Sequence, residues 1–404
     1  MKILWVKSDF LHPANRGGQI RTLEMLKCLH RRHEIHYVAF DDRKNEEGLE
    51  KSSGYCSRAY PVPHSVAPHR SFGFMCQLLQ GLVSPVPVAV KRYTSARMKY
   101  HVQALLEQEK FDTLVCDFLF PAPNIPDLSR SVLFQHNVES IIWRRHVEHA
   151  KNPVKKAYFK LQACRMHAFE GAICRSAGHI VAVSEADLAT MQRLFGAERI
   201  SSIDTGVDIG YFTPPCAAGA KENPMVADLI FTGSMDWLPN IDAAQFFITE
   251  VLPYVRKERP DCRVIIAGRR PPSAIQELAK HNSGVVVTGT VPDVRPYLWG
   301  STVSVVPLRI GGGTRLKIFE AMAARVPVVS TSIGAEGLPL KDGKHIAIAD
   351  SPEPFARCCL DLLADADLRR RTADQAWEFV SSRFSWEAVS REFESALEGG
   401  PRPN

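Results

Sequence analysis

Short apolar runs recur along the chain, separated by longer stretches in which apolar residues follow helical spacing. The runs of the first half read KILWVK, EIHYVAF, TLVCDFL, SVLFQH and GHIVAVS, and those of the second half read ADLIFTG, RVIIAG, VVVTGT, TVSVVPL and VPVVST. β-branched runs that alternate with helical segments are typical of βαβ units with parallel sheets. The pattern therefore predicts an α/β protein in which this organisation occurs twice.

Residues 207–224 interrupt the pattern, because they are rich in Pro, Gly and Ala and follow neither period. We interpret them as a linker between two Rossmann-like domains, at residues 1–206 and 225–384, that face each other across a cleft. The remaining segment, residues 385–404, contains a helix whose apolar face fits either domain, including a return to the first. Open parallel sheets bind ligands beyond the carboxyl ends of their strands, so the functional residues are expected there.

The composition is that of an ordinary folded protein. A length of 404 residues suits two domains, since single cores stop growing at roughly 250 residues. The first apolar run is broken by Lys7 and Asp9, which predicts a strand rather than a signal peptide. Ten cysteines without a C-x-x-C pair fit a reducing compartment. No stretch approaches the roughly 18 apolar residues of a membrane span, so we expect a cytoplasmic protein.

Positive charge is concentrated in the first half. Residues 1–205 contain 28 Lys and Arg against 20 Asp and Glu, a net charge of +8, whereas the rest contains 22 against 24, a net charge of −2. Residues 61–92 and 144–160 combine bases with aromatic and apolar residues. Two interpretations stay open: peripheral contact with the inner face of an anionic membrane that carries a lipid-linked acceptor, or a solvated basic face. No recognition element for nucleic acid accompanies these bases.

The segment VVPLRIGGGTRLKIFEAMA, residues 305–323, holds the strongest candidate site. Arg315 and Lys317 fall in the first turn of the expected helix, where cations are disfavoured by about 0.3–1 kcal/mol each. A bound anion would explain them, because glycines permit close backbone approach, helix N–H groups attract negative charge and an Arg fork binds phosphate. The alternative is a glycine turn with two solvated cations. Glu320 lies on the same helix, placed either to bind sugar hydroxyls or to remain solvated.

Five further candidate residues follow four of the predicted strands. Arg269 follows RVIIAG and is a candidate anion ligand or a solvated loop residue. Asp117 ends TLVCD, and His136 ends SVLFQH, where an exposed imidazole suits hydrogen bonding to a sugar or proton transfer. Their alternatives are a turn carboxylate and a structural histidine. Gly17 and Gly18 lie between the first strand and a helix, beside Arg16 and Arg21, in either a binding loop or a helix-entry turn.

Five segments in the second half resemble the donor-site signature of group 1 retaining glycosyltransferases with the GT-B architecture. They read, in the family's order, IVAVSEADL, DTGVDIGYF, FTGSMDWLPNIDAAQFF, VIIAGRRP and GGGTRLKIFEAMAARVPVVST. The resemblance covers most of residues 180–350, and the first half matches more loosely. It implies transfer of a sugar from a nucleotide-sugar donor, held mainly by the second domain, to an acceptor held by the first.

The resemblance also assigns roles to residues. The loop amides face the donor sugar and diphosphate, and Glu320 binds the ribose hydroxyls. The loop residues are Gly311, Gly312, Gly313, Thr314, Arg315 and Leu316. The loop at Gly17 and Gly18 approaches the donor phosphates or the acceptor.

Two departures from the family pattern are visible. Gly312 stands where relatives often carry the first Glu of an E-x7-E pair. Ser234 and Asn240, which follow Gly233 in the donor-site turn, stand where relatives carry a basic pair. The diphosphate charge must then be met by Arg315, Lys317 and Arg269.

We therefore expect a metal-independent retaining glycosyltransferase that uses a UDP- or GDP-sugar and acts on a glycan, glycolipid or other glycoconjugate. A sugar-nucleotide epimerase of the same architecture and a non-catalytic sugar-nucleotide-binding protein remain alternatives. The sequence DAD at residues 365–367 is interpreted as a helix cap rather than a metal ligand. No metal site and no cofactor beyond the donor substrate are predicted.

Overall fold

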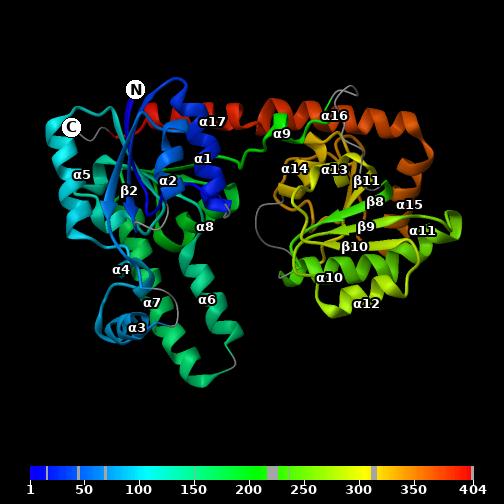
Figure 1. Cartoon of the computed structure of the whole chain (residues 1–404), viewed down its shortest axis with the longest axis horizontal. Coiled ribbons are helices and arrows are strands. Elements are labelled where there is room, and N and C mark those ends of the chain that lie inside the picture. The colour runs from blue at the N-terminus through cyan, green and yellow to red at the C-terminus, as the bar shows by residue number, and fades with distance from the viewer. Residues whose placement is uncertain are drawn as a thin grey trace. The chain divides into compact units, whose positions relative to one another are not determined.

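The computed structural model describes residues 1–14, 17–42, 46–67, 71–150, 152–215, 226–235, 237–310 and 316–401. The chain divides into two compact units. The first comprises Met1–Thr205 together with Val389–Asn404, and the second comprises Gly206–Ala388. Each unit contains a parallel β-sheet with helices around it (Figure 1).

The sheet of the first unit has seven strands in the order β3-β2-β1-β4-β5-β6-β7, all paired in parallel. The strands are β1 (Lys2–Val6), β2 (Glu34–Asp41), β3 (Arg58–Pro63), β4 (Thr113–Asp117), β5 (Val132–Gln135), β6 (His179–Ala182) and β7 (Ile200–Ser202). The helices are α1 (Gly17–His30), α2 (Glu46–Glu50), α3 (Phe72–Val83), α4 (Val88–Lys91), α5 (Ala96–Gln108), α6 (Glu139–His149), α7 (Pro153–Ser176), α8 (Glu185–Phe195) and the greater part of α17 (Trp386–Glu398).

The sheet of the second unit has six parallel strands in the order β10-β9-β8-β11-β12-β13. The strands are β8 (Ala227–Thr232), β9 (Val264–Ala267), β10 (Val285–Gly289), β11 (Ser301–Val306), β12 (Val328–Ser330) and β13 (Ala347–Ile348). The helices are α9 (Ile209–Phe212), α10 (Leu238–Phe246), α11 (Leu252–Glu258), α12 (Ser273–Lys280), α13 (Arg295–Trp299), α14 (Leu316–Ala323), α15 (Pro352–Ala364) and α16 (Ala366–Phe384). A π-helical segment, Phe247–Val251, joins α10 to α11.

Burial on both faces explains why the central strands are continuous apolar runs. Every residue of β4 is buried, and so is every residue of β9. Parallel strands covered on both faces by helices require such sequences. The prediction of an α/β organisation that occurs twice is confirmed, and all ten predicted runs contain a strand.

Each sheet has one point at which the strand order reverses. In the first unit it lies between β1 and β4, and in the second between β8 and β11. At such a point the loops beyond the two carboxyl ends diverge to opposite faces, which leaves room for a ligand. Candidate binding residues are therefore expected after β1, β4, β8 and β11.

The C-terminal helix α17 packs on the first unit. The ring of Phe393 lies 4.8 Å from that of Phe134 and 5.6 Å from that of Trp5, and the Arg32 guanidinium forms an ion pair with Glu394 at 2.8 Å. The expectation that this helix returns to the first unit is confirmed.

The interpretation of residues 365–367 as a cap is confirmed, because the Asp365 carboxylate accepts hydrogen bonds from the backbone N–H groups of Asp367 and Leu368 at the start of α16. The segment predicted as a linker begins within the second unit. Val207 forms a parallel bridge with Ser385, and α9 follows it. Residues 216–225 lie outside the described part of the chain.

Candidate functional site

The turn after β8 is shaped by two glycines. A Cβ atom on Gly268 would lie 1.8 Å from the carbonyl oxygen of Gly233. The backbone segments after β8 and β9 can therefore lie this close only because residue 268 is a glycine. A Cβ atom on Gly233 would lie 2.9 Å from both the Lys317 ammonium nitrogen and Asn240 Cγ. Gly233, predicted as a donor-site residue, thus makes room for a cation at the carboxyl end of β8.

Lys317 lies in the first turn of α14, as the sequence predicted. Its ammonium group donates a hydrogen bond to Asn240 Oδ1 at 2.7 Å and lies 4.5 Å from the centre of the Phe231 ring. Asn240 is buried, and its amide donates to the backbone carbonyl of Ser234 at 2.8 Å. These contacts hold the cation beside the helix N-terminus, where an isolated cation would be unfavourable.

Arg269 approaches the same turn from β9. Its Nε–H donates to Ser234 Oγ at 2.7 Å, and its carbonyl oxygen accepts from the backbone N–H of Met235 at 2.9 Å. The side chain of Arg269 is exposed. Ser234 and Asn240, which the family resemblance places at the positions of a basic pair, thus each hold a cation from elsewhere in the chain. The sequence did not predict these pairings.

Glu320 lies one turn after Lys317 on α14 and is half-buried. Burial raises the pKa of its carboxyl group, and the Lys317 ammonium opposes that shift. Leu316, at the start of α14, is also half-buried. The structure therefore brings together Gly233, Arg269, Lys317 and Glu320 around the carboxyl ends of β8 and β9. The predicted loop residues Gly311, Gly312, Gly313, Thr314 and Arg315 lie outside the described residues.

In the first unit, Asp117 is fully buried at the end of β4. Its Oδ1 atom accepts from Lys7 Nζ at 2.7 Å and His136 Nε2 at 2.6 Å, and its Oδ2 atom accepts from Trp5 Nε1 and Thr22 Oγ1, both at 2.8 Å. Burial alone would raise the pKa of Asp117, but the Lys7 ammonium and the His136 hydrogen bond hold it well below its ordinary value. Asp117 is therefore an ionised carboxylate with both oxygens occupied.

His136 differs from the sequence expectation of an exposed imidazole, because it is 5% exposed. Its Nε2–H donates to Asp117, which leaves Nδ1 to accept from Arg21 Nη1 at 3.2 Å. Burial lowers the pKa of His136 to about 4, so the ring is neutral at pH 7. The neighbouring strand end and α1 cover the side chain, which a linear pattern does not reveal.

Gly17 and Gly18 begin α1, and Gly18 lies beside this network. A Cβ atom on Gly18 would lie 3.8 Å from His136 Nδ1, an ordinary contact, and one on Gly17 would meet no atom of the described residues within 4 Å. One turn later, the buried Arg21 donates to Thr205 Oγ1, while its Nε atom has no hydrogen-bond partner among the residues that the structure describes. Arg16 lies outside the described residues. Steric crowding by the described residues therefore does not require either glycine.

Trp5, Lys7, Thr22 and Thr205 belong to this network although the sequence pattern did not predict them. The one available signal was Lys7, a charged residue directly after an apolar strand. Its partner Asp117 lies 110 positions away, and only the pairing of β1 with β4 places the two strand ends together.

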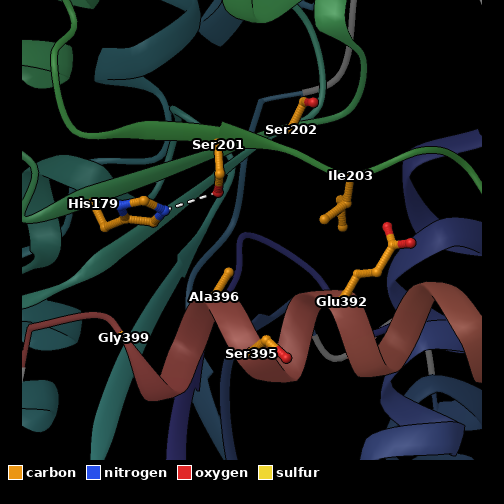
Figure 2. Close-up of a pocket in the computed structure, with 8 residues that line it drawn as sticks. All are labelled: His179, Ser201, Ser202, Ile203, Glu392, Ser395, Ala396 and Gly399. Carbon is orange, nitrogen blue, oxygen red and sulfur yellow. Dashed lines mark hydrogen bonds between the residues drawn. The ribbon is translucent and has the colours of Figure 1, made fainter.

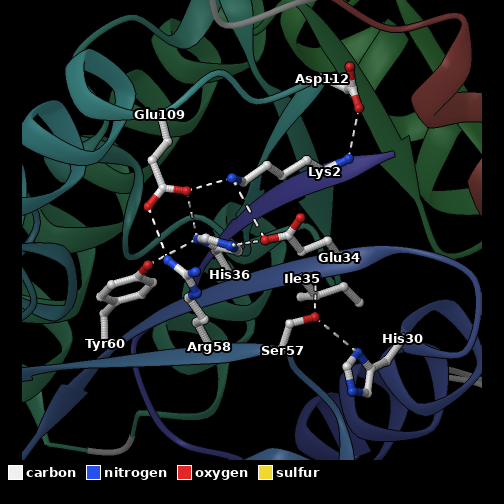
Figure 3. A network of polar contacts seen from close by, with 10 residues as sticks. All are labelled: Lys2, His30, Glu34, Ile35, His36, Ser57, Arg58, Tyr60, Glu109 and Asp112. Carbon is white, nitrogen blue, oxygen red and sulfur yellow. Dashed lines mark hydrogen bonds and ion pairs between the residues drawn. The ribbon is translucent and has the colours of Figure 1, made fainter.

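A second charged cluster lies at the amino ends of the strands of this sheet, opposite to the carboxyl ends that hold the network around Asp117 (Figure 3). Lys2, Glu34 and Arg58 are the first residues of β1, β2 and β3. Glu109 pairs with Lys2 at 2.5 Å and with Arg58 at 3.4 Å, and His36 contacts Glu34 at 2.8 Å. Opposite charges meet one another at the amino ends of the strands, so we assign this cluster to the stability of the sheet.

A hollow of about 560 Å³ lies in the first unit between β6, the edge strand β7 and helix α17 (Figure 2). His179, at the start of β6, contacts Ser201 Oγ at 2.9 Å, and Glu392 and Ser395 of α17 line the other side. None of the predicted site residues that the structure describes lines this hollow. It is separate from the network around Asp117.

Two family profiles match the chain. Residues 15–211 match Glycosyltransferase Family 4, and residues 227–365 match Glycosyl transferases group 1. Together they cover every strand of the two sheets except β1, and the residues of both candidate sites except Trp5 and Lys7. The chain belongs to the group 1, family 4 glycosyltransferases, as the resemblance in the sequence predicted.

Two relatives extend this assignment. An uncharacterized 44.6 kDa protein in the cps region of Klebsiella pneumoniae is 22% identical over 400 residues, which cover 96% of this chain and 97% of the relative. The D-inositol 3-phosphate glycosyltransferase of Xylanimonas cellulosilytica is 26% identical over 234 residues, which cover 52% of this chain and 54% of that enzyme.

Solved structures share the fold. Sucrose-phosphate synthase from Thermosynechococcus elongatus superposes with a TM-score of 0.66 at 15% identity, covering 99% of this chain and 98% of that chain. Anabaena HepE, in complex with UDP and glucose, has a TM-score of 0.61 at 16% identity, covering 99% and 100%. The chain therefore has the GT-B fold expected from its sequence.

Proposed function

We propose that the protein is a retaining glycosyltransferase that transfers a sugar from a UDP- or GDP-sugar to a glycan, glycolipid or other glycoconjugate. One observation carries the proposal: Lys317 and Arg269 converge on the turn after β8 and are held there by Asn240 and Ser234. That turn lies at the switch point of the second sheet, where open α/β sheets bind nucleotides.

The two cations suit the charge that develops in sugar transfer. As the bond between the sugar and the nucleoside diphosphate breaks, negative charge grows on the diphosphate, and preorganised donors stabilise it best. The hydrogen bond from Lys317 to Asn240 fixes one donor in advance, and the Arg269 fork can offer two parallel hydrogen bonds to phosphate. We propose that these side chains, with Arg315 and the amides of the loop at Gly311, Gly312, Gly313 and Thr314, carry this task without a metal ion.

Glu320 is proposed to bind the ribose. It lies one turn beyond Lys317 on α14, so a diphosphate at the helix N-terminus would direct the nucleoside along the helix. A carboxylate accepts hydrogen bonds from two adjacent hydroxyl groups. Because burial raises the pKa of Glu320, donation from the ribose hydroxyls would also compensate the buried charge.

The first unit is proposed to hold the acceptor. His136 and Asp117 are our candidates for catalytic residues there, with the backbone of Gly17 and Gly18 beside them. His136 can accept a proton only at Nδ1, because Nε2 donates to Asp117. Arg21 occupies Nδ1, so proton transfer through His136 requires Arg21 to turn away, and an acceptor phosphate or carboxylate would draw it away.

The comparisons support the choice of substrates. HepE was crystallised with UDP-glucose, which favours a UDP-sugar as the first donor to test. The relative from K. pneumoniae lies in a cps region, which favours a role in polysaccharide biosynthesis. We place the enzyme in the cytoplasm, supported by free cysteines throughout the described chain. Among the described residues, no helix is both long and apolar enough to cross a bilayer.

Slow hydrolysis of the donor without acceptor tests the proposal. The protein would be incubated with UDP-glucose, UDP-galactose or GDP-mannose, and proton NMR would record the released sugar before its anomers equilibrate. We expect release from one donor with the anomeric configuration retained. An inverted product would contradict a retaining mechanism, an epimerised sugar would indicate an epimerase, and binding without turnover in the presence of acceptors would indicate a non-catalytic protein.

A further inference from the structure

Arg21 is a buried cation that is held by uncharged groups. It lies on α1 and is 8% exposed. Its guanidinium donates to Thr205 Oγ1 and, at 3.2 Å, to His136 Nδ1. Its Nε–H group meets no acceptor among the described residues. A cation that is removed from water without a counter-charge destabilises the folded protein, so Arg21 needs an explanation other than stability.

The ionised groups of the network around Asp117 do not balance. Lys7 and Asp117 form an ion pair at 2.7 Å and neutralise each other. His136 is uncharged at pH 7, because burial lowers its pKa to about 4. Burial also lowers the pKa of Arg21, to about 10, which still leaves the guanidinium charged at pH 7. The described side chains of the network therefore carry one positive charge in excess.

The rest of the first unit does not supply a carboxylate that pairs with Arg21. Asp117 and Asp187 attract the guanidinium, but neither accepts a hydrogen bond from it. Asp187 lies in the first turn of α8, and its Oδ2 atom accepts from Ser184 Oγ at 3.0 Å. The residues of the first unit outside the described ranges include no Asp or Glu. An anion from outside the chain would balance the charge.

The start of α1 leaves room for an anion beside Arg21. The first amides of a helix have no partner within it and attract negative charge, and α1 has no acidic residue in its first turn. A Cβ atom on Gly18 would lie 3.8 Å from His136 Nδ1, so a small group fits beside the imidazole. Gly17, one residue earlier, is exposed, so the helix start reaches the surface of the unit.

We infer that Arg21 and the first amides of α1 bind an oxyanion, a carboxylate or phosphate group, that belongs to the sugar acceptor. The fork of an arginine can donate two parallel hydrogen bonds to either group. The inference rests on the proposed function, since it concerns the acceptor of that reaction. It narrows the acceptor to an acidic one, such as a glycan that ends in a uronic acid or a sugar phosphate.

Binding of the oxyanion also releases His136. In the structure Arg21 occupies Nδ1 of the imidazole. Once the guanidinium pairs with the oxyanion, Nδ1 is free to accept the proton of the acceptor hydroxyl. The hydroxyl oxygen then bonds to the donor sugar, and the bond from that sugar to the diphosphate breaks with its electron pair. A neutral acceptor leaves Arg21 on Nδ1, so the same contact selects an acidic acceptor.

Phosphate binding to the full chain tests this inference. Saturating UDP first fills the donor site, and phosphorus NMR then follows a titration with inorganic phosphate. We expect one saturable site, and Arg21→Gln should raise its Kd about tenfold or more, because a charged fork is lost. Lys27→Gln, which removes a cation of the same helix that is paired with Glu24, is the matched control and should bind like the wild type. Equal Kd values for the wild type and Arg21→Gln would overturn the inference.

Gly18→Ala guards against a folding defect in Arg21→Gln. Alanine favours a helix more than glycine does, and its Cβ atom makes only ordinary contacts with the described residues, so the fold should be kept. The methyl group fills the space beside His136 Nδ1, and the Kd for phosphate should therefore rise severalfold. Unchanged phosphate binding by folded Gly18→Ala protein would overturn the inference even if Arg21→Gln did not fold.

Further titrations identify the source of the oxyanion. Methyl glucuronide should displace phosphate at about tenfold lower concentration than methyl glucoside, which lacks the carboxylate. Equal displacement by the two would overturn the acceptor assignment. UDP should bind Arg21→Gln and the wild type equally well. Loss of phosphate binding on addition of UDP, or a tenfold weaker UDP complex of Arg21→Gln, would assign Arg21 to the donor diphosphate instead. Phosphate binding without donor hydrolysis would contradict the proposed function and leave the anion site standing.

Discussion

The ammonium group of Lys317 donates to the side-chain oxygen of Asn240 at 2.7 Å, although the two residues are 77 positions apart in the sequence. The family resemblance predicted a base at the position of Asn240. A cation from α14 therefore reaches the turn after β8 by another route, and the site keeps its positive charge. The contact also explains how a lysine is accommodated in the first turn of a helix.

Lys317→Met should weaken nucleoside-diphosphate binding. Hydrogen bonds to charged groups contribute about 1.5–3 kcal/mol, which corresponds to a rise in Kd of about 10- to 150-fold. Calorimetric titration with UDP and GDP measures the change. Lys280→Met, which removes an exposed lysine paired with Glu277, serves as the matched control. An unchanged Kd for Lys317→Met would place the diphosphate elsewhere.

Arg269→Gln should raise the Kd for the diphosphate about tenfold, while its neighbour Arg270→Gln should have little effect. The Nε–H of Arg269 points at Ser234 Oγ in the site turn, which directs its guanidinium toward the proposed phosphates. Ser234→Ala should lower the affinity for the diphosphate less, because it removes the hydrogen bond that positions Arg269 but keeps the cation. Equal effects of the Arg269 and Arg270 variants would indicate only a general attraction of charge.

Asp117→Asn should destabilise the first unit by about 3–5 kcal/mol, since it leaves the Lys7 ammonium buried without a counter-charge. Urea unfolding followed by tryptophan fluorescence reports the change, because Trp5 donates to the same carboxylate. The double variant with Lys7→Met and Asp117→Asn should lose less free energy of unfolding than the sum of the losses in the two single variants. Strict additivity would show that the pair does not interact.

Stability should fall as pH rises through the range set by Glu139. Burial, with the nearby Glu170 carboxylate, raises the pKa of Glu139 from 4.5 to about 7 in the folded protein. Between these values the unfolded chain loses a proton that the folded protein keeps, so unfolding becomes more favourable with increasing pH, by about 3 kcal/mol in total. Below pH 4.5 the group has no effect, and above pH 7 the loss is complete.

Glu139→Gln should remove this slope and make the protein more stable than the wild type at pH 8. Unfolding free energies at pH 5, 6, 7 and 8 test the prediction. The control is Glu148→Gln, an exposed residue of the same helix. A wild-type profile that stays flat over this range, or one that Glu139→Gln leaves unchanged, would contradict the raised pKa.

Most of the fold could be predicted from the sequence because the central strands are buried on both faces and must be apolar throughout. The strands β3, β7 and β13 were missed. β3, at one edge of its sheet, contains Pro61 and Pro63, while β7 and β13 have only three and two residues. Edge strands tolerate proline and polar residues, so their sequences lack the signal of a buried run.

The sequence by itself determined the α/β organisation that occurs twice, the family, and the charged helix start at Lys317. Each of these follows from residues that are close together in the chain, because spacing and local chemistry can be recognised there directly from the sequence. Only the tertiary structure showed that His136 is buried between Asp117 and Arg21, and that Ser234 and Asn240 hold the two cations of the second unit. Those partners are brought together by parallel strand pairing across the switch points, and no local pattern specifies which distant strand ends will meet.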